Sequence, residues 1–343
     1  MTTLLLTKGD VRSLLTLDAC IDAVEEAFAE HARGQSLGAG VLGHHLPGGG
    51  FHIKVAAGGE PPRFVAKING NFADNDAAGL PRIQGLIVLC DARNGTPLAV
   101  MDSTLITAIR TAAATAVAAR HFARADAGIL TIAGCGLQSR LQVRAVSRVR
   151  LLREIFAHDT HRPRAEAFAR EMAAELRIPV SVVDDLNAGT MRSDLVVTCT
   201  PSTTPILHGC DVQPGTFVAA VGADSEAKQE IDPGLLASAA VVPDLVDQAA
   251  TIGDLHHAIE AGLMRRDQVR AELGAVCAGM AAGRMTEGEI VIFDSTGTAL
   301  QDLAAATIVY EGALARGYGR RIDFLGESPA ASNPERPLAR INL

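Results

Sequence analysis

Residues 129–139 read Ile-Leu-Thr-Ile-Ala-Gly-Cys-Gly-Leu-Gln-Ser, an apolar run that ends in a glycine turn. Gly134, Gly136 and Ser139 match the pattern G-x-G-x-x-G/A, with serine as the third small residue. In this pattern the first glycine forms a tight turn, and the second lets the backbone approach a pyrophosphate at a helix N-terminus. The motif follows a strand-like run and precedes a helical stretch to about Arg150. It therefore predicts a strand, turn and helix that bind a dinucleotide.

The next strand-like segment, Ile155–His158, is followed by an acidic residue, Asp159, which lies 25 residues after Gly134. An acid at this place accepts hydrogen bonds from ribose hydroxyls and repels a 2′-phosphate, which favours NAD. Arg162 and Arg164 follow closely and could neutralise a phosphate instead. The sequence thus predicts NAD as the cofactor and leaves NADP open.

The segments that follow continue the alternation of apolar runs and helical stretches that is typical of a parallel sheet. The expected further strands are Val180–Val183, Leu195–Cys199, Phe217–Val221 and Ala240–Pro243. The middle of the chain is therefore predicted to be a doubly wound α/β domain of the Rossmann type. A break over 283–288 and a strand-like segment, Ile290–Asp294, follow it.

The residues before this domain show a different pattern. Leu17–Glu30 has apolar residues at helical spacing among acids, which predicts an amphipathic helix. Glycine and proline clusters separate short alternating stretches that predict an antiparallel sheet, namely Phe51–Ala56, Phe64–Asn69 and Gln84–Asp91. The alanine-rich Ser103–His121 predicts one long helix, capped by Ser103 or Thr104. Ala299–Ala315 predicts a similar helix, which we expect to return to this first part of the chain.

The composition describes a two-domain α/β protein, because the chain has 343 residues of which 48% are hydrophobic. With 31 Lys and Arg against 39 Asp and Glu, and no Trp, it lacks the basic surface and stacking residues that bind nucleic acid. It also lacks a signal-peptide pattern and an apolar run of about 18 residues, so we expect neither export nor membrane insertion. The six cysteines form no C-x-x-C pair, and His256 and His257 have no nearby cysteine or spaced pair of acids. We therefore expect no metal, reduced thiols and a cytoplasmic location.

Five separated motifs occur in order with compatible spacing: KINGNFADN (67–75) with GLPRIQG (79–85), AVMDSTLITAIRTAAATAVAA (99–119), IAGCGLQ (132–138), AVGADSEAKQE (220–230) and IFDSTGTALQD (292–302). In these motifs the chain resembles the ornithine cyclodeaminase and mu-crystallin family over about residues 10–320. That family includes cyclodeaminases, amino-acid dehydrogenases, imine reductases and a hormone-binding lens protein. A shared fold does not by itself decide among these activities.

The resemblance implies a Rossmann domain at residues 116–298 and an α+β substrate and dimerisation domain formed from both chain ends, residues 1–115 and 299–325. It also implies a homodimer with the nicotinamide bound between the domains. Residues 326–343, rich in serine, proline and charge, are expected to form a loose tail. One departure concerns the family's cyclodeaminases, which carry a further substrate arginine where residues 39–45 contain none. This departure disfavours cyclodeaminase activity.

The resemblance also assigns roles to single residues. Lys67 matches the family's substrate lysine, Arg110 the arginine near substrate carboxylate and cofactor, and Asp224 the catalytic acid. Cofactor contacts are implied for Arg110 and for Thr111, Leu137, Gln138, Asp159, Thr200, Val221, Gly222, Ala223, Lys228 and Ser295, beside Gly134 and Gly136 of the glycine turn.

The residues support this chemistry on their own. Lys67 is flanked by apolar residues in a strand, which indicates a buried functional lysine. Arg110 can hold a carboxylate through two parallel hydrogen bonds, and Lys54, in the alternating stretch FHIKVA, is a further candidate to bind the substrate. Asp224 follows the apolar FVAAVGA, where ligands bind in α/β sheets, and can act as general acid or base on a substrate nitrogen. The alternative is that it caps a helix that begins at Ser225.

Ser295 and Thr296 follow the strand-like EIVIFD and could cap the next helix or contact cofactor and substrate. Together these residues predict an NAD(P)-dependent oxidoreductase of CH–NH bonds, which reduces an α-imino acid to an L-amino acid or catalyses the reverse reaction. Lys54, with Arg63 or Arg82, could hold a second carboxylate, as in iminosuccinate. The alternatives are an ornithine cyclodeaminase, which forms L-proline and ammonia with internally recycled NAD, and a non-catalytic ligand-binding protein.

Overall fold

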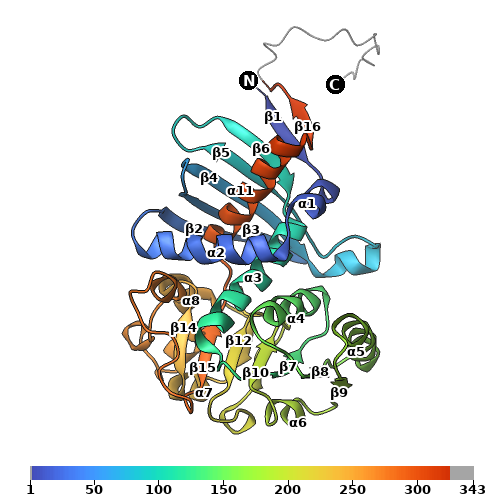
Figure 1. Cartoon of the computed structure of the whole chain (residues 1–343), viewed down its shortest axis with the longest axis vertical. Coiled ribbons are helices and arrows are strands. Elements are labelled where there is room, and N and C mark those ends of the chain that lie inside the picture. Colours follow the sequence, from blue (N-terminus) through green and yellow to red (C-terminus); the bar gives the residue numbers. More distant parts are fainter. Residues whose placement is uncertain (1, 325–343) are drawn as a thin grey trace.

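The first of two seven-stranded sheets joins the two ends of the chain, in a computed structural model that describes residues 2–324. Its strand order is β16-β1-β6-β5-β4-β3-β2 (Figure 1). The strands are β1 (Thr3–Leu6), β2 (Leu37–Leu46), β3 (Gly49–Gly58), β4 (Arg63–Phe72), β5 (Ile83–Asp91), β6 (Pro97–Asp102) and β16 (Arg320–Ile322). β2 to β6 pair antiparallel, as predicted, whereas β1 runs parallel to β6 and antiparallel to β16. The domain boundaries at 115/116 and 298/299 stay predictions, and the expected tail at 326–343 lies outside the described residues.

The second sheet is parallel throughout, in the order β14-β15-β12-β10-β7-β8-β9. Its strands are β7 (Ile129–Ala133), β8 (Glu154–His158), β9 (Val180–Val182), β10 (Leu195–Thr198), β12 (Phe217–Ala220), β14 (Ala240–Pro243) and β15 (Val291–Asp294). The chain runs outward from β7 to β9 and then returns to β10 on the other side of β7. This reversal confirms the predicted doubly wound fold and marks where such sheets bind ligands. A small sheet of β11 (Thr203–Leu207) and β13 (Gln229–Ile231) was not predicted.

Three long helices connect the two sheets and cover one face of the first: α2 (Leu17–Ala32), α3 (Thr104–Phe122) and α11 (Ala299–Arg316). α11 crosses β3 and β4, and α2 packs against both α3 and α11 (Figure 1). α3 contacts β5 of the first sheet and β12 and β15 of the second. Its buried residues are mostly alanines, whose small side chains let both sheets approach it closely.

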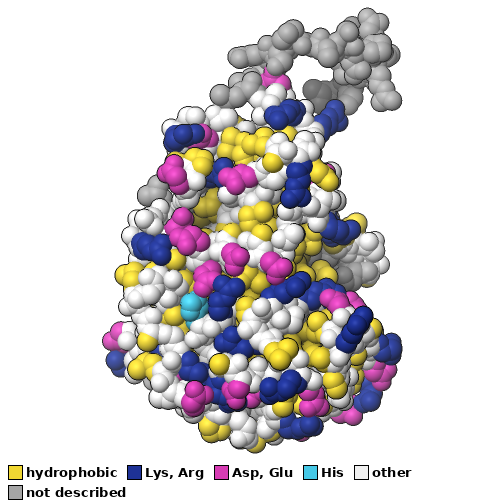
Figure 2. Space-filling view, viewed as in Figure 1, with side chains coloured by type: hydrophobic (Ala, Val, Ile, Leu, Met, Phe, Trp, Pro, Cys, Tyr) yellow, Lys and Arg dark blue, Asp and Glu magenta, His cyan; other side chains and the backbone are white. Residues whose placement is uncertain are grey.

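The remaining helices are short or lie on the faces of the second sheet. They are α1 (Lys8–Leu14), α4 (Leu137–Val149), α5 (Arg162–Leu176), α6 (Leu186–Thr190), α7 (Pro233–Ser238), α8 (Val246–Ile252), α9 (Asp254–Glu260) and α10 (Leu273–Cys277). None of the helices in residues 2–324 combines the length and the apolar character of a membrane-spanning segment. On the face shown in Figure 2, Lys and Arg side chains alternate with Asp and Glu over the lower half of the molecule.

The start of α3 differs from the sequence prediction. Ser103 or Thr104 was expected to cap this helix, and that prediction was wrong. The carboxylate of Asp102 accepts hydrogen bonds from the backbone N–H groups of Thr104 at 3.1 Å and Leu105 at 3.4 Å. The Ser103 hydroxyl is instead directed to the first sheet, where it donates to Asn69 Oδ1 at 2.5 Å.

Candidate functional site

The predicted cofactor residues lie together at the carboxyl edge of the second sheet. Strands β7, β8, β10, β12 and β15 are followed in turn by Gly134 with Gly136, Asp159, Thr200, Val221–Ala223, and Ser295. Leu137 and Gln138 begin α4, and Gln138 Nε2 donates to the carbonyl of Ala108 in α3 at 3.3 Å. This contact places the glycine turn beside the helix that carries Arg110 and Thr111.

The glycine turn leaves room for a bound anion. Gly134 has φ +88°, and a Cβ there would lie 2.9 Å from the carbonyl oxygen of Cys199. A Cβ on Gly136 would meet no atom within 4 Å, so a ligand can approach the backbone at that point. α4 starts at Gly136 without a side-chain cap, so its first N–H groups point toward this space. The turn therefore fits the pyrophosphate of a dinucleotide.

The carboxylate of Asp159 is fixed at the end of β8. Its oxygens accept from the backbone N–H of Cys135 at 2.9 Å and of His161 at 2.8 Å. Burial acts to raise the pKa of Asp159, but these two hydrogen bonds outweigh it and the pKa lies below its ordinary value. Arg162 pairs with Glu166 at 3.0 Å and with Asp184, so it is directed away from Asp159.

Lys67 and Arg110 converge on one buried carboxylate, that of Asp302 in α11. Arg110 Nε donates to Asp302 Oδ1 at 3.0 Å, and its Nη1 donates to Gln301 Oε1 at 2.6 Å. Lys67 Nζ lies 2.6 Å from Asp302 Oδ2. Burial acts to raise the pKa of Asp302, but the two cations outweigh it and keep the carboxyl ionised. The three groups thus form a cationic pair with one balancing anion.

The ammonium of Lys67 retains hydrogen-bonding capacity. Its side chain is 3% exposed, and although it forms the ion pair with Asp302, the angles do not make an aligned hydrogen bond. Burial, with the neighbouring charge of Arg110, lowers the pKa of Lys67 to about 7. A buried donor without an aligned acceptor is uncommon in proteins and suits a group that binds a ligand.

Lys54 is buried beside the segment between β15 and α11, and its predicted role in substrate binding stays a prediction. Its ammonium donates to the backbone carbonyls of Thr296 at 3.1 Å and Gly297 at 2.5 Å, so it anchors the segment between β15 and α11. The hydroxyl of Thr296, which was expected to face the substrate, donates to Asp244 Oδ1 at 2.8 Å and accepts from Gln248 at 2.8 Å. Both residues therefore hold the loop in place.

Asp224 and Lys228 form an ion pair at 2.5 Å on the loop after β12. The Asp224 side chain is 49% exposed, and it lies close enough to Lys54 and His52 of β3 for their charges to affect it. Burial acts to raise the pKa of Asp224, but the Lys228 ammonium outweighs it and the pKa is below its ordinary value. Within the described residues no helix begins at Ser225, so the helix-cap alternative for Asp224 was wrong.

The model of the ornithine cyclodeaminase/mu-crystallin family matches residues 1–317 of the chain. The chain belongs to this family. Among solved family structures, it is similar to an archaeal alanine dehydrogenase dimer with bound NAD, at 36% identity and a TM-score of 0.91, over 94% of this chain and 100% of the other.

Two imino-acid reductases of the family are also similar. The Δ1-pyrroline-2-carboxylate reductase of Thermococcus litoralis, solved with NADH and L-proline, has 30% identity and a TM-score of 0.89, over 93% of this chain and 100% of the other. The iminosuccinate reductase of Paracoccus denitrificans, solved with NAD⁺, has 34% identity and a TM-score of 0.87, over 94% of this chain and 100% of the other.

Sequence reasoning about this family member missed two groups of site residues. Asp302 lies 192 residues after its partner Arg110, and an acid in the first turn of a helix ordinarily indicates only helix stabilisation. The buried carboxylates behind the cofactor edge, Glu230 and Asp244, were also missed. Asp302 lies in the quoted motif IFDSTGTALQD, and that position within a motif was the available signal.

Arg63 and Arg82 are the arginines that could accompany Lys54 in binding a second substrate carboxylate. Arg63 pairs with Glu311 at 2.8 Å and stacks over Tyr310, at the start of β4. Arg82 is exposed just before β5. The pairing of Lys54 with Arg63 or Arg82 to bind a second carboxylate stays a prediction.

Within residues 2–324, potential metal ligands come together in two places outside the site: Glu25, His121 and Cys277, and His256, His257 and Glu260, with the ligand atoms of each group within 4.8 Å of one another. The group of His256, His257 and Glu260 contains neither a cysteine nor a pair of acids, although His256 pairs with Glu260 at 3.4 Å. In the other group, Glu25 is already paired with Arg120. The absence of a metal stays a prediction.

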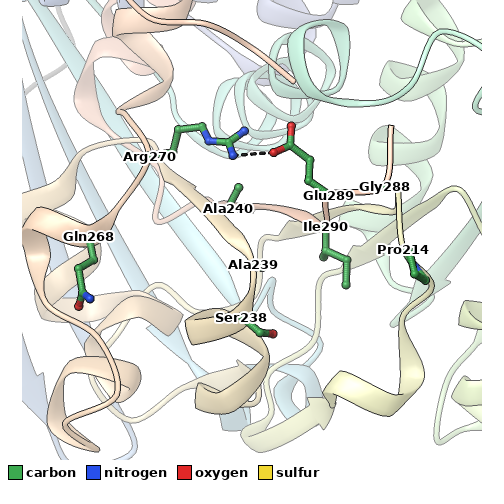
Figure 3. Close-up of a pocket in the computed structure, with 9 residues that line it drawn as sticks. All are labelled: Pro214, Ser238, Ala239, Ala240, Gln268, Arg270, Gly288, Glu289 and Ile290. Carbon is green, nitrogen blue, oxygen red and sulfur yellow. Dashed lines mark hydrogen bonds and ion pairs between the residues drawn. The ribbon is translucent and has the colours of Figure 1, made fainter. Parts of the chain in front are cut away.

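A pocket of about 500 Å³ lies at the opposite, amino edge of the second sheet (Figure 3). It is bordered by Ala240 and Ile290, at the starts of β14 and β15, and by the ion pair of Arg270 with Glu289 at 2.5 Å. Because α/β sheets bind ligands at their carboxyl edge, this pocket is separate from the candidate site.

Proposed function

We propose that this protein is an NAD-dependent oxidoreductase that interconverts an α-imino acid and an L-amino acid. The observation that carries the proposal is the closeness of two groups beside a dinucleotide-binding sheet: Lys67, Arg110 and Asp302 form one, and Asp224 on its loop forms the other. The buried Lys54 lies near enough to Arg110, Asp224 and Asp302 for the charge of each to affect it. The family membership and the two similar imino-acid reductases support it.

Arg110, Lys67 and Asp302 together form the proposed binding group for the substrate carboxylate. Arg110 and Lys67 offer two adjacent cations, which suit the α-carboxylate of an amino or imino acid. Asp302 keeps both side chains in place and leaves the group with one net positive charge. When bound, the nicotinamide supplies or accepts the hydride at the α-carbon. Fixing the carboxylate restricts how that carbon can lie against the cofactor.

Asp224 is the group that we assign to the proton on the substrate's imine or amine nitrogen. As an ionised carboxylate it accepts the N–H of a protonated imine and, in the oxidative direction, removes a proton from the amine. In the reductive direction the protonated imine already carries its proton, so hydride addition at the α-carbon gives the neutral amine while the Asp224 carboxylate accepts a hydrogen bond from the N–H. The amine then takes up a further proton from water, which reaches Asp224 because its side chain is half exposed. The other acid or base candidate is Lys67, whose pKa of about 7 allows both protonation states at neutral pH.

A screen of NADH consumption tests the proposal and identifies the substrate. It pairs 2-oxo acids with ammonia or methylamine and includes dicarboxylates and preformed cyclic imines. Net NADH oxidation with at least one of them is the expected result. Release of ammonia from ornithine without net NADH turnover would indicate a cyclodeaminase instead, and tight ligand binding without turnover would indicate a binding protein.

The cofactor preference has its own test. We expect kcat/KM to be at least about ten-fold higher with NADH than with NADPH, because the Asp159 carboxylate repels a 2′-phosphate and Arg162 is held by two acids. Asp159→Ala should erode this preference, mainly by weakening NADH binding. Equal use of NADPH by the unmodified protein would show that Arg164, 3.4 Å from Asp159, binds the phosphate.

The homodimer is proposed from the open face of the first sheet. Ile68 lies beside Ile53 and Leu86 across β3, β4 and β5, and all three point away from the face that α11 covers. The large apolar side chains on this face are 37–64% exposed, at Leu42, Phe51, Phe64, Ile68 and Leu86. A continuous apolar face of this kind marks an interface, and the similar alanine dehydrogenase is a dimer. The occupant that we propose is a second copy of this chain.

Ile68→Lys is therefore expected to convert the protein from twice the chain mass to the chain mass, because it places a charge at the centre of the interface. Light scattering after size exclusion measures this. Leu151→Lys is the matched control, since Leu151 is 83% exposed on the second half of the molecule and should leave the mass unchanged. A monomeric unmodified protein at micromolar concentration would contradict the proposal.

We also propose a cytoplasmic location. All six cysteines are free, including the buried Cys20 and Cys135. Free thiols of this number persist most readily in a reducing compartment.

A further inference from the structure

We propose that Glu230 is a positioning residue that holds the Asp224 loop and the cofactor edge in one arrangement, an inference that rests on the function proposed above. Glu230 lies in β13 and its side chain is fully buried. Oε1 accepts from Thr200 N at 2.6 Å and Thr200 Oγ1 at 2.7 Å, and Oε2 accepts from Thr198 Oγ1 and Gly222 N, both at 2.7 Å. Four donors therefore occupy one carboxylate.

These donors belong to the carboxyl ends of two neighbouring strands. β10 pairs with β12 so that Thr198 lies opposite Ala220, and the chain beyond each strand continues to Thr200 and Gly222. Thr200 and Gly222 are two of the predicted cofactor contacts. A Cβ at Gly222 would lie 2.3 Å from the carbonyl oxygen of Thr200 and 2.4 Å from the Glu230 carboxyl carbon. The glycine thus makes room for the carboxylate that ties the two strand ends together.

The same carboxylate closes the loop that carries the catalytic candidate. The Gly222 N–H and the Glu230 carboxylate join the two ends of residues 222–230, and Asp224 and Lys228 lie between them. On its other side the loop is held by His257 Nε2, which lies 2.9 Å from the carbonyl oxygen of Lys228. The direction of Asp224 toward the junction of the two sheets therefore depends on this closure.

Two further buried acids fix the position of Glu230. Asp254 Oδ1 accepts from the backbone N–H of Glu230 at 2.8 Å and of Ile231 at 2.9 Å. Asp294, at the end of β15, accepts from the N–H groups of Asp254 at 3.3 Å and Leu255 at 2.8 Å. The next residue after Asp294 is Ser295, so the row of contacts extends from the cofactor edge to the loop that Lys54 anchors.

Glu230→Gln tests the proposal, because an amide retains the shape but offers donors where two of the four partners also donate. We expect the Kd for NADH to rise by roughly ten-fold and kcat at saturating NADH to fall by a similar factor. Binding is measured by NADH fluorescence at a temperature at which circular dichroism shows the variant folded. This readout does not require turnover, so it separates failure of this inference from failure of the proposed function.

Glu289→Gln is the matched control. Glu289 also closes a loop, at the amino edge of the same sheet, where it accepts from the backbone of Met285 and Thr286 and pairs with Arg270. The Glu289→Gln substitution should lower Tm and leave the Kd for NADH unchanged. Equal effects of the two variants on that Kd, or an unchanged Kd in Glu230→Gln, would overturn the proposal. If Glu230→Gln does not fold, Thr198→Val is the variant to test, since it removes only one of the four donors to the Glu230 carboxylate. A three-fold or greater rise in the Kd supports the proposal and an unchanged Kd overturns it.

Discussion

Asp224→Asn is expected to lower kcat for imino-acid reduction by roughly 100-fold to 10,000-fold, the range of general acid and base catalysis. Asparagine keeps the shape of the side chain but neither donates nor accepts a proton as a carboxyl group does. It also removes the ion pair with Lys228. Binding of NADH should remain within about two-fold of the unmodified protein, because Asp224 belongs to the substrate side of the loop.

Steady-state kinetics on any substrate found in the screen, together with NADH titration, measure both quantities. Asp247→Asn is the control, because Asp247 is 92% exposed and pairs only at the surface, with Arg266. Near-normal turnover in Asp224→Asn would remove Asp224 from the catalytic residues. Lys67 would then be the proton donor that remains to be tested.

Lys67→Met is expected to lower kcat/KM by about 100-fold or more, since it removes one of two cations that bind the carboxylate and leaves Asp302 paired with Arg110 alone. Most of the loss should appear in KM. The same substitution at Lys8, which is exposed in α1, is the control and should change neither constant.

The expected pH dependence of kcat/KM follows from the direction in which the pKa of Lys67 is shifted. Because burial lowers its pKa to about 7, the ammonium is charged below that pH and increasingly neutral above it. For the unmodified protein, kcat/KM in the reductive direction should therefore fall as pH rises through about 7. A preformed cyclic imine is the suitable substrate, since ammonia does not then titrate. Lys67→Arg, which stays charged, should remove this decline, and an identical decline in Lys67→Arg would assign it to another group.

The sequence predicted the parts of the site that depend on local pattern. The glycine turn, the acid after β8 and the carboxyl ends of five strands follow from alternation and spacing, and these place residues such as Asp159 correctly. Lys67 was also predicted, because a lysine among apolar neighbours in a strand is unusual. The strands β1 and β16, at one side of the first sheet, were missed, since runs of four and three residues carry too little periodicity to be distinguished from loops.

Local sequence pattern does not predict contacts between side chains that lie far apart in the chain. Alternation places Lys54 on the correct face of β3, but it does not show that carbonyls at Thr296 and Gly297 occupy its ammonium. Asp302 has the appearance of an ordinary helix-start acid until the fold brings it to Lys67 and Arg110. In the same way, Asp102 rather than Ser103 caps α3 because the Ser103 hydroxyl has a stronger partner in Asn69.

The placement of Asp302 on α11 has a consequence for the order in which the chain matures during synthesis. Lys67 and Arg110 are made early, but their balancing anion follows 192 residues after Arg110, near the end of the described chain. Until α11 has left the ribosome, the early part lacks both the helix that covers β3 and β4 and the acid that pairs with Lys67 and Arg110. The continuous nucleotide-binding stretch between them can fold first, since domains generally fold as units. The half that carries Lys67, Arg110 and Asp302 is therefore completed last.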